Sequence, residues 1–246
     1  MKTVLLFSGG IDSLASYCIL KNQGKSVDKF LYLHFGVRYN REEVKAVYKL
    51  LQFLGEDEKY GWVDLDFVQG FEDAGTAEIP YRNLLAVVVA KYFGDKVVLS
   101  IEEGTQRNIS RDRSDAFMRL LNRLYKYLDN KQRLSVVNPV RNLTKQDEVK
   151  VIKDYFGDKA QEVIDMTFSC YFPMDGRHCG NCSACIRKFF ALCYNGLEFN
   201  NVIRNPIESD VFKVYVGRIE RGVYKGRRGR QYREVLENLR REGWSF

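Results

Sequence analysis

The sequence predicts an α/β fold in which helices cover both faces of a doubly wound parallel sheet. Short, continuous apolar runs alternate along the chain with segments of helical periodicity, and such runs are typical of strands buried on both faces. A glycine-containing loop separates the first apolar run from the first helical segment, where parallel sheets bind ligands. A cysteine-rich segment after residue 169 predicts an additional small metal-binding subdomain.

Five apolar runs are the expected strands, at residues 4–7, 30–33, 62–65, 97–101 and 134–137. The first expected helix starts near Leu14 and ends before Gly24. Residues 41–54 form an amphipathic pattern, residues 83–93 are apolar nearly all round and predict a buried helix, and residues 115–128 are amphipathic again. Thr144 and Asp147 predict a capping box that opens the next helix. This alternation predicts right-handed βαβ crossovers.

The bulk composition suits one α/β domain with a small appendage. The chain has 246 residues, of which 45% are hydrophobic and 29% are charged, so overall disorder is not expected. No apolar run approaches the roughly 18 residues that a membrane span needs. The apolar stretch at residues 3–7 is too short for the core of a signal peptide. We therefore expect a cytoplasmic protein that has no membrane partner.

The loop after the first expected strand reads Ser-Gly-Gly-Ile-Asp-Ser at residues 8–13. Glycines permit positive φ and close approach to a ligand, and the N–H groups of the loop and of the helix N-terminus attract an anion. The loop is not a Walker A motif, because no Gly-Lys-Ser/Thr ends it, and a dinucleotide fingerprint would need a third glycine. The sequence therefore predicts a phosphate-binding loop of another kind; a tight turn that merely caps the helix is the alternative.

Four of the six cysteines lie between residues 170 and 185, with the spacing C-x8-C-x2-C-x2-C. Disulfides are rare in cytosolic proteins, so such a cluster indicates metal binding or catalysis. Cys-x-x-Cys steps let thiolates converge on one ion, and four thiolates form a closed structural zinc site. The segment has almost no aliphatic residues, so we expect the metal to order it. The expected ligands are Cys170, Cys179, Cys182 and Cys185.

An iron–sulfur cluster is the alternative metal group, because four cysteines also ligate such clusters. His178 adjoins Cys179, and this position makes the histidine an awkward replacement for a cysteine ligand. Cys18 and Cys193 lie in helical patterns, and we expect both in the core.

The loop at residues 8–13 resembles the PP-loop of the N-type ATP pyrophosphatases, which holds the pyrophosphate part of ATP. The cysteine motif, preceded by Ser169, resembles the zinc motif of the 7-cyano-7-deazaguanine synthase (preQ0 synthase, QueC) family. Residues 79–83 (Ile-Pro-Tyr-Arg-Asn) and 138–145 (Asn-Pro-Val-Arg-Asn-Leu-Thr-Lys) resemble further segments of that family. The resemblance runs from about residue 2 to 195 and implies an adenine-nucleotide alpha-hydrolase-like, Rossmann-like fold.

The resemblance also implies a reaction. The family is understood to adenylate 7-carboxy-7-deazaguanine with ATP and to use ammonia, passing from the acid to the amide and then to the nitrile. Asp12 is the expected contact to Mg²⁺. Arg82 and Lys145 are our candidates for neutralising the charge of the substrate carboxylate or of phosphate, although both could instead be solvated residues at helix starts. The expected cofactor-binding residues are Ser8, Gly9, Gly10, Asp12 and Ser13, with Gly36 and Arg38 after the second strand.

The resemblance weakens after residue 101. Residues 102–105 and 110–117 depart from the family pattern. Within them, only Asp112 and Phe117 match that pattern. Because this region is expected to contribute to the substrate pocket, the resemblance supports ATP-dependent adenylation better than it supports the deazaguanine substrate. Three alternatives stay open. They are an enzyme that stops at the amide or joins the activated acid to an amine, a PP-loop enzyme that modifies nucleic acid, and a non-catalytic nucleotide-binding module.

The formal net charge of +7 belongs mainly to the end of the chain, since residues 201–246 hold 11 Lys and Arg residues against 6 Asp and Glu residues. Residues 212–216 alternate like a short strand, and Tyr224 and Tyr232 are interleaved with basic residues, which is compatible with nucleic-acid binding. A solvated helical appendage or a subunit contact is the alternative. The expected parts are an ATP-binding domain at 1–165, a zinc-binding subdomain at 166–200 and a basic extension at 201–246; the resemblance implies a homodimer.

Overall fold

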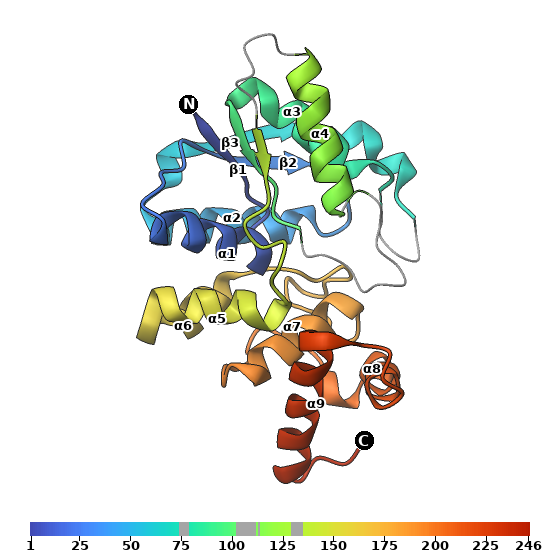
Figure 1. Cartoon of the computed structure of the whole chain (residues 1–246). Helices are drawn as coiled ribbons and strands as arrows, with labels where there is room; N and C mark the ends of the chain where they lie inside the picture. The colour runs from blue at the N-terminus through green and yellow to red at the C-terminus, as the bar shows by residue number, and fades with distance from the viewer. Residues whose placement is uncertain (74–78, 102–111, 113, 129–134) are drawn as a thin grey trace.

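The computed structural model describes residues 1–73, 79–101, 112, 114–128 and 135–246. Its centre is a five-stranded sheet of order β3-β2-β1-β4-β5, in which every neighbouring pair is parallel (Figure 1). The strands are β1 (Thr3–Leu6), β2 (Lys29–His34), β3 (Tyr60–Asp64), β4 (Lys96–Val98) and β5 (Ser135–Val137). The predicted doubly wound parallel sheet is therefore confirmed.

Helices cover both faces of the sheet, as Figure 1 shows. One face carries α1 (Ile11–Asn22), α2 (Asn40–Leu54), α5 (Lys145–Phe156) and α6 (Ala160–Met166), which share one core cluster with β1 and β2. The other face carries α3 (Arg82–Ala90) and α4 (Asp115–Leu128), which pack on β1, β4 and β5. The order of the strands reverses between β1 and β4, so the loops after these two strands diverge and leave a crevice for a ligand.

The prediction of a buried helix at residues 83–93 is correct only in part, since Asn83, Ala86, Val87 and Ala90 are buried while other residues are exposed. Helix α3 ends at Ala90 and continues as a 3-10 turn at Lys91–Phe93. Val88 is 39% exposed and Tyr92 is 83% exposed, because only one side of α3 faces the sheet. Apolar residues on every side of a helix therefore did not require burial on every side.

The C-terminal part of the chain is helical and lies on the side of α5 that faces away from the sheet (Figure 1). Its helices are α7 (Ser183–Tyr194), α8 (Asp210–Glu220) and α9 (Gly226–Arg241), and they share one apolar cluster. The stacked rings of Phe190 and Phe212 have centroids 5.5 Å apart, and the ring of Tyr232 lies 4.9 Å from that of Phe190. Aromatic residues from α7, α8 and α9 therefore build this cluster.

The structure overturns the strand expected at residues 212–216 and removes one argument for nucleic-acid binding, the tyrosines among the basic residues. Residues 212–216 lie in α8, whose N-cap Ser209 accepts a hydrogen bond from the Phe212 N–H, and the buried Phe212, Tyr215, Val216 and Ile219 follow the helical period. The side chains of Tyr224 and Tyr232 are only 8% and 2% exposed, so they stabilise the helical cluster and cannot stack on bases.

The described part of the chain holds no helix long and apolar enough to cross a membrane.

Candidate active site and metal centre

The glycine loop leaves β1 and is held between α2 and a distant segment of the chain. Gly9 has a φ of +73°, and a Cβ atom there would lie 2.9 Å from both Ala46 Cβ and Val47 N of α2. The Gly9 carbonyl accepts a hydrogen bond of 3.0 Å from the Phe168 N–H. A side chain at residue 9 would clash with α2, so glycine is required for the loop to pass so close to this helix.

Gly10 is the N-cap of α1, and its side-chain-free backbone leaves the first turn of this helix open. The Ser13 hydroxyl donates a 3.0 Å hydrogen bond to the Gly10 carbonyl and leaves the N–H groups of the first turn uncapped by a side chain. Backbone N–H groups at such a helix end carry partial positive charge and attract anions. The loop conformation is therefore suited to a phosphate group.

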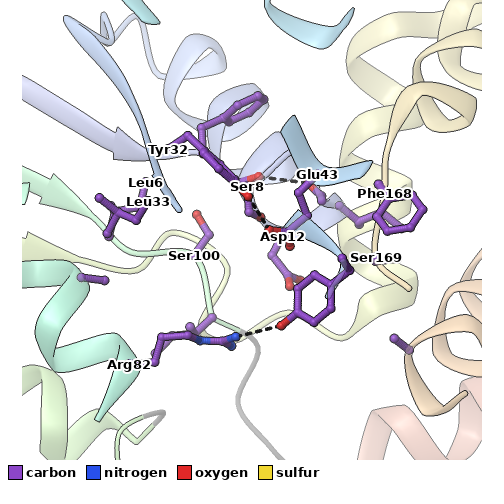
Figure 2. Close-up of a pocket in the computed structure, with 18 of the residues that line it drawn as sticks. Leu6, Ser8, Asp12, Tyr32, Leu33, Glu43, Arg82, Ser100, Phe168 and Ser169 are labelled. Carbon is purple, nitrogen blue, oxygen red and sulfur yellow. Dashed lines mark hydrogen bonds between the residues drawn. The ribbon is translucent and has the colours of Figure 1, made fainter. Parts of the chain in front are cut away.

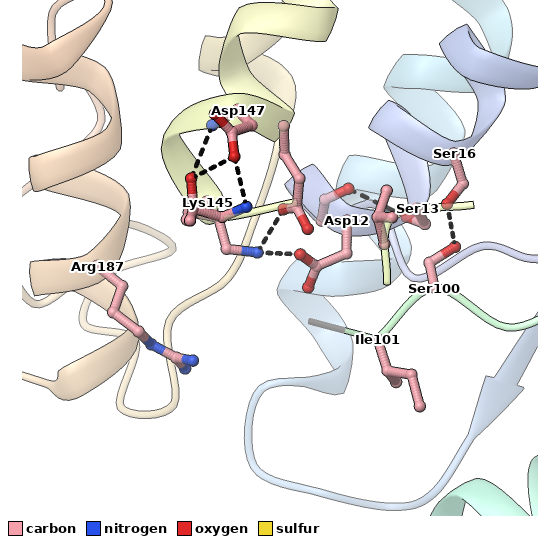
Figure 3. A network of polar contacts seen from close by, with 12 residues as sticks. Asp12, Ser13, Ser16, Ser100, Ile101, Lys145, Asp147 and Arg187 are labelled. Carbon is pink, nitrogen blue, oxygen red and sulfur yellow. Dashed lines mark hydrogen bonds and ion pairs between the residues drawn. The ribbon is translucent and has the colours of Figure 1, made fainter. Parts of the chain in front are cut away.

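An ion pair joins this loop to α5. Lys145 is the first residue of α5, and its ammonium group donates to the Asp12 carboxylate and, at 2.7 Å, to Glu148 Oε2 (Figure 3). Burial alone would raise the pKa of Asp12, but the nearby ammonium of Lys145, with a smaller effect of Arg187, lowers the pKa to about 2. Asp12 is therefore a carboxylate at neutral pH, as a metal ligand or a partner of Lys145 must be.

Further polar side chains from β2, α2 and α3 line the same pocket, as Figure 2 shows. The Arg82 guanidinium donates to the Tyr39 hydroxyl at 3.2 Å, and the Tyr32 hydroxyl donates to Glu43 Oε2 at 3.1 Å. Burial raises the pKa of Glu43 to about 7, and the charge of Arg82 only partly offsets this effect. Glu43 is therefore poised to change its protonation state near neutral pH.

These groups line one pocket of about 240 Å³ at the carboxyl ends of β1 and β4, where the strand order reverses. Of the predicted residues, the pocket is lined by Ser8, Gly10, Asp12, Ser13, Arg82 and Lys145. The structure thus brings together three segments that are far apart in the sequence: the glycine loop, the start of α3 and the start of α5. This is the crevice in which open α/β sheets bind ligands.

Three predicted residues do not line this pocket. Gly9 lies behind it against α2, and Gly36, with a φ of +70°, packs on Asp66 and Gln69. Arg38 pairs with Glu72, with Nε and Oε1 3.2 Å apart, and its guanidinium lies 5.0 Å from the centre of the Phe172 ring. A contact of Gly36 or Arg38 with a cofactor stays a prediction.

Sequence reasoning missed further polar residues of the pocket, among them Glu43 and Arg187. Glu43 lies in the first turn of α2, where acidic residues are common for other reasons, so no local pattern marks it. Arg187 extends from α7 toward Lys145 and Asp12 in Figure 3. The cysteine spacing did not indicate Arg187, because it lies two residues after Cys185 in α7 and residues two apart on a helix do not share a face. Of the divergent stretch, residues 102–111 and 113 lie outside the described residues, while the Asp112 carboxylate accepts a 2.8 Å hydrogen bond from Asn83 in the pocket wall.

The four predicted cysteine ligands converge. The Sγ atoms of Cys170, Cys179, Cys182 and Cys185 all lie within 4.8 Å of one another, and all four residues are buried. Three of the Sγ–Sγ distances are 4.0, 3.9 and 3.5 Å. A tetrahedral ion with Zn–S bonds of about 2.3 Å would hold sulfurs about 3.8 Å apart. The geometry fits a single tetrahedral ion such as zinc, whereas a multi-iron cluster would hold the four sulfurs further apart.

Backbone groups support the thiolate ligands. Cys170 Sγ accepts hydrogen bonds from the N–H groups of Phe172 and Cys179 at 3.4 and 3.3 Å. Cys182 is the N-cap of α7, and its Sγ accepts from the Cys185 N–H at 3.5 Å. Such donors stabilise negative charge on sulfur, as a metal-bound thiolate requires.

His178 lies beside the cluster but is not one of the converging groups. Its Nδ1 atom lies 2.9 Å from the Asn201 carbonyl, and its Nε2 atom accepts from the Ser169 N–H at 3.3 Å. Both ring nitrogens therefore have partners, in agreement with the expectation that His178 does not replace a cysteine.

The cysteine segment also forms one wall of the pocket, through Cys170, Tyr171, Ala184 and Arg187. The Arg187 Nη2 atom donates to the Tyr171 hydroxyl at 3.2 Å across this wall. A change in the conformation of the cysteine segment would therefore change the shape of the pocket.

The raised pKa of Glu43 predicts a measurable pH dependence of stability. Between pH 4.5 and about 7 the folded protein binds a proton at Glu43 that the unfolded chain releases, so this group lowers stability as the pH rises through that range. The Glu43→Gln variant lacks this loss. Its free energy of unfolding relative to the unmodified protein, from urea titrations at several pH values, should increase from pH 4.5 to 7 and then level off. A constant difference would contradict the raised pKa.

The sheet order, the crevice at its switch point and the glycine loop define a Rossmann-like α/β protein, to which a four-cysteine site is added. A family model described as Queuosine biosynthesis protein QueC matches residues 72–195, about half of the chain. The chain belongs to the QueC family.

Curated relatives agree with this membership. A 7-cyano-7-deazaguanine synthase from Methanocaldococcus jannaschii is 25% identical over 232 residues, which cover 80% of this chain and 97% of the relative. The proteins of the same name from Methanococcus aeolicus and Pyrococcus furiosus are 24% and 27% identical, and the matches cover 80% and 76% of this chain and 97% and 90% of the relatives. The recognition made from the motifs is confirmed.

Proposed function

We propose that the chain transfers AMP from ATP to the carboxylate of a 7-carboxy-7-deazaguanine-like acid and that ammonia then displaces AMP to form an amide. A second transfer of AMP, to the amide oxygen, followed by loss of AMP and protons, yields the nitrile 7-cyano-7-deazaguanine (preQ0). Each of the two transfers releases one pyrophosphate, and each following step releases one AMP, so one nitrile requires two ATP. The observation that carries the proposal is the meeting of the glycine loop, Lys145 and Arg82 in one pocket.

The loop at residues 8–13 would hold the phosphates, because its helix end is open and faces the pocket. The ammonium of Lys145 neutralises charge that develops on the phosphate oxygens when pyrophosphate leaves. Arg82, on the facing wall, is placed to bind the carboxylate of the acid, which a guanidinium can grip with two hydrogen bonds.

Asp12 is a suitable ligand for Mg²⁺. Its side chain is 36% exposed toward the pocket, and its low pKa keeps it negatively charged. Mg²⁺ favours few carboxylates combined with phosphate oxygens, so one aspartate is chemically sufficient. When bound, the ion would neutralise phosphate charge, while Asp12 and Lys145 keep the loop and α5 in register.

The four cysteines fit a structural zinc ion, which would fix the wall that carries Tyr171 and Arg187. All four ligand positions are filled by cysteine, so the ion has no open position for substrate. We also propose a homodimer, as the family resemblance implies; sedimentation equilibrium of the purified chain tests it.

The proposal is tested by measuring pyrophosphate and AMP release with Mg-ATP, with and without 7-carboxy-7-deazaguanine and ammonium, and by mass spectrometry of the products. We expect release that depends on the acid, and formation of the nitrile. In Asp12→Ala we expect release to fall by at least about a hundredfold, because the phosphates lose their metal contact.

Other outcomes would redirect the assignment. AMP formation that ends at the amide, or that requires an amine other than ammonia, would indicate an amide-forming or conjugating enzyme. Release that depends on nucleic acid instead of the acid would indicate a nucleic-acid modification enzyme. No release with either, in a protein that binds ATP, would contradict the proposal.

A further inference from the structure

The C-terminal helix α9 contacts the start of α5, although the two segments are far apart in the sequence. The Thr144 hydroxyl and the Gln231 Oε1 atom, which are 87 residues apart, lie 2.7 Å from each other. Gln231 Nε2 donates to the Asp147 carboxylate at 2.9 Å, so one amide reaches both members of the capping box. Thr144 is 7% exposed and Gln231 is 5% exposed, so water does not compete at this contact.

A second residue of α9 strengthens the contact. Arg227 Nη2 lies 2.9 Å from Asp147 Oδ2 and also donates to the Asn142 carbonyl at 2.5 Å. The Asp147 carboxylate also accepts from the Thr144 N–H at 2.8 Å. The carboxylate that closes the first turn of α5 is therefore held by its own helix on one side and by α9 on the other.

This first turn carries the pocket's ion pair. Lys145 follows the N-cap Thr144 directly, and its ammonium reaches Asp12 across the pocket and Glu148 one turn further along α5 (Figure 3). A shift of the first turn would move this ammonium relative to the glycine loop. Helix starts fray unless their N–H groups are capped, so an external support at this turn has a direct consequence for Lys145.

We propose that α9 is a positioning element of the active site, in which Gln231 and Arg227 hold the capping box of α5 and thereby fix Lys145 against Asp12. The role assigned to Lys145 rests on the proposed function. Helix α9 lies beyond the residues that the family model matches. At the basic start of α9, Arg227 thus contacts the carboxylate of Asp147 and the Asn142 carbonyl.

Four variants of the full chain test the proposal. Gln231→Met keeps the volume and removes the two polar contacts, and Arg227→Met removes the ion pair at an exposed site. Arg240→Met is the matched control, because Arg240 is a cation of the same helix that pairs with Glu220 of α8, at 2.6 Å, and not with α5. Arg227→Lys keeps the positive charge, so it should behave more like the unmodified protein than Arg227→Met does.

The first measurement does not require activity. Acylation of lysines by a small anhydride, followed by mass spectrometry, compares labelling at Lys145 with labelling at Lys150, which lies on the same helix and has a side chain that is 63% exposed. We expect the ratio to rise several-fold in Gln231→Met and Arg227→Met and to stay constant in Arg240→Met. Hydrogen exchange of the Asp147 and Glu148 amides should accelerate in the same two variants.

The second measurement is kinetic. We expect kcat for AMP release to fall about tenfold in Gln231→Met and Arg227→Met while KM for ATP changes less than twofold, since a small displacement of a catalytic group mainly affects the chemical step. If the unmodified chain releases no AMP, the proposed function fails, but labelling and exchange still decide the role of α9. Unchanged labelling and exchange in both variants would overturn the proposal.

Discussion

Replacing Lys145 by methionine is expected to lower kcat for AMP release by about 10²- to 10³-fold, the usual cost of removing one preorganised group that stabilises transition-state charge. The side chain is only 10% exposed and contacts both Asp12 and Glu148, so no solvent cation takes its place. Binding of ATP should weaken much less than catalysis, because the loop at residues 8–13 keeps its N–H groups.

The matched control is Lys150→Met. Lys150 lies on the same helix, is exposed, and pairs with Asp154 at 3.1 Å, so the variant should keep full activity. Steady-state kinetics and equilibrium binding of ATP separate the two effects. A Lys145→Met enzyme with unchanged kcat would show that the ion pair has only a structural role.

The same variant should change the acid stability of the protein. The pKa of Asp12 is lowered from 3.8 to about 2, so its ionised form stabilises the folded state above pH 3.8 and this contribution is lost as the pH falls toward 2. Without Lys145, the pKa of Asp12 should no longer be lowered, and the ionised carboxylate should no longer stabilise the folded state. Acid unfolding followed by circular dichroism should therefore begin at a higher pH in Lys145→Met.

Removing the metal is expected to unfold the cysteine segment and to abolish AMP release. The segment has few aliphatic residues, so the bond between metal and thiolates supplies most of its order. We expect Cys185→Ser to lose the metal and to lower the midpoint of thermal unfolding by at least about 10 °C, which corresponds to several kcal/mol in a chain of this size. AMP release should fall when the metal is lost, because Tyr171 and Arg187 belong to the cysteine segment and also line the pocket.

The control is Cys193→Ser, which makes the same chemical change on the same helix away from the four ligands. Metal analysis by mass spectrometry should find one zinc per chain in the unmodified protein and in Cys193→Ser, and none in Cys185→Ser. Iron in place of zinc would correct the identity of the ion. Full activity of a metal-free Cys185→Ser protein would contradict the link between metal centre and pocket.

Structural features that depend on residues close together in the sequence could be predicted from the sequence. The alternation of apolar runs and helical patterns predicted the parallel sheet, and the capping box at Thr144 and Asp147 is present with both reciprocal hydrogen bonds. Cysteine spacing predicted the convergence of four thiols, because short Cys-x-x-Cys turns bring sulfurs together whatever the rest of the fold does. These are local effects of backbone geometry and of residue spacing.

Local patterns misled where packing decides. The alternation at residues 212–216 is also part of a helical stripe, and α8 forms because Phe212, Tyr215 and Ile219 pack on α7 and α9. Tyr224 and Tyr232 of the basic extension pack in that same cluster. The basic residues beside them in the sequence therefore did not predict their environment. The five residues 212–216 alone do not show which helices will pack against them.

The sequence by itself determined the class of fold, the glycine loop after β1, the convergence of four cysteines and the membership of a family. The tertiary structure decided which side chains share the pocket, namely that Glu43 of α2 and Arg187 of α7 line it together with Lys145 and Arg82. It also decided that α9 supports the start of α5. The physical reason is that these contacts join segments tens of residues apart, whose proximity depends on how the helices pack on the sheet and on each other.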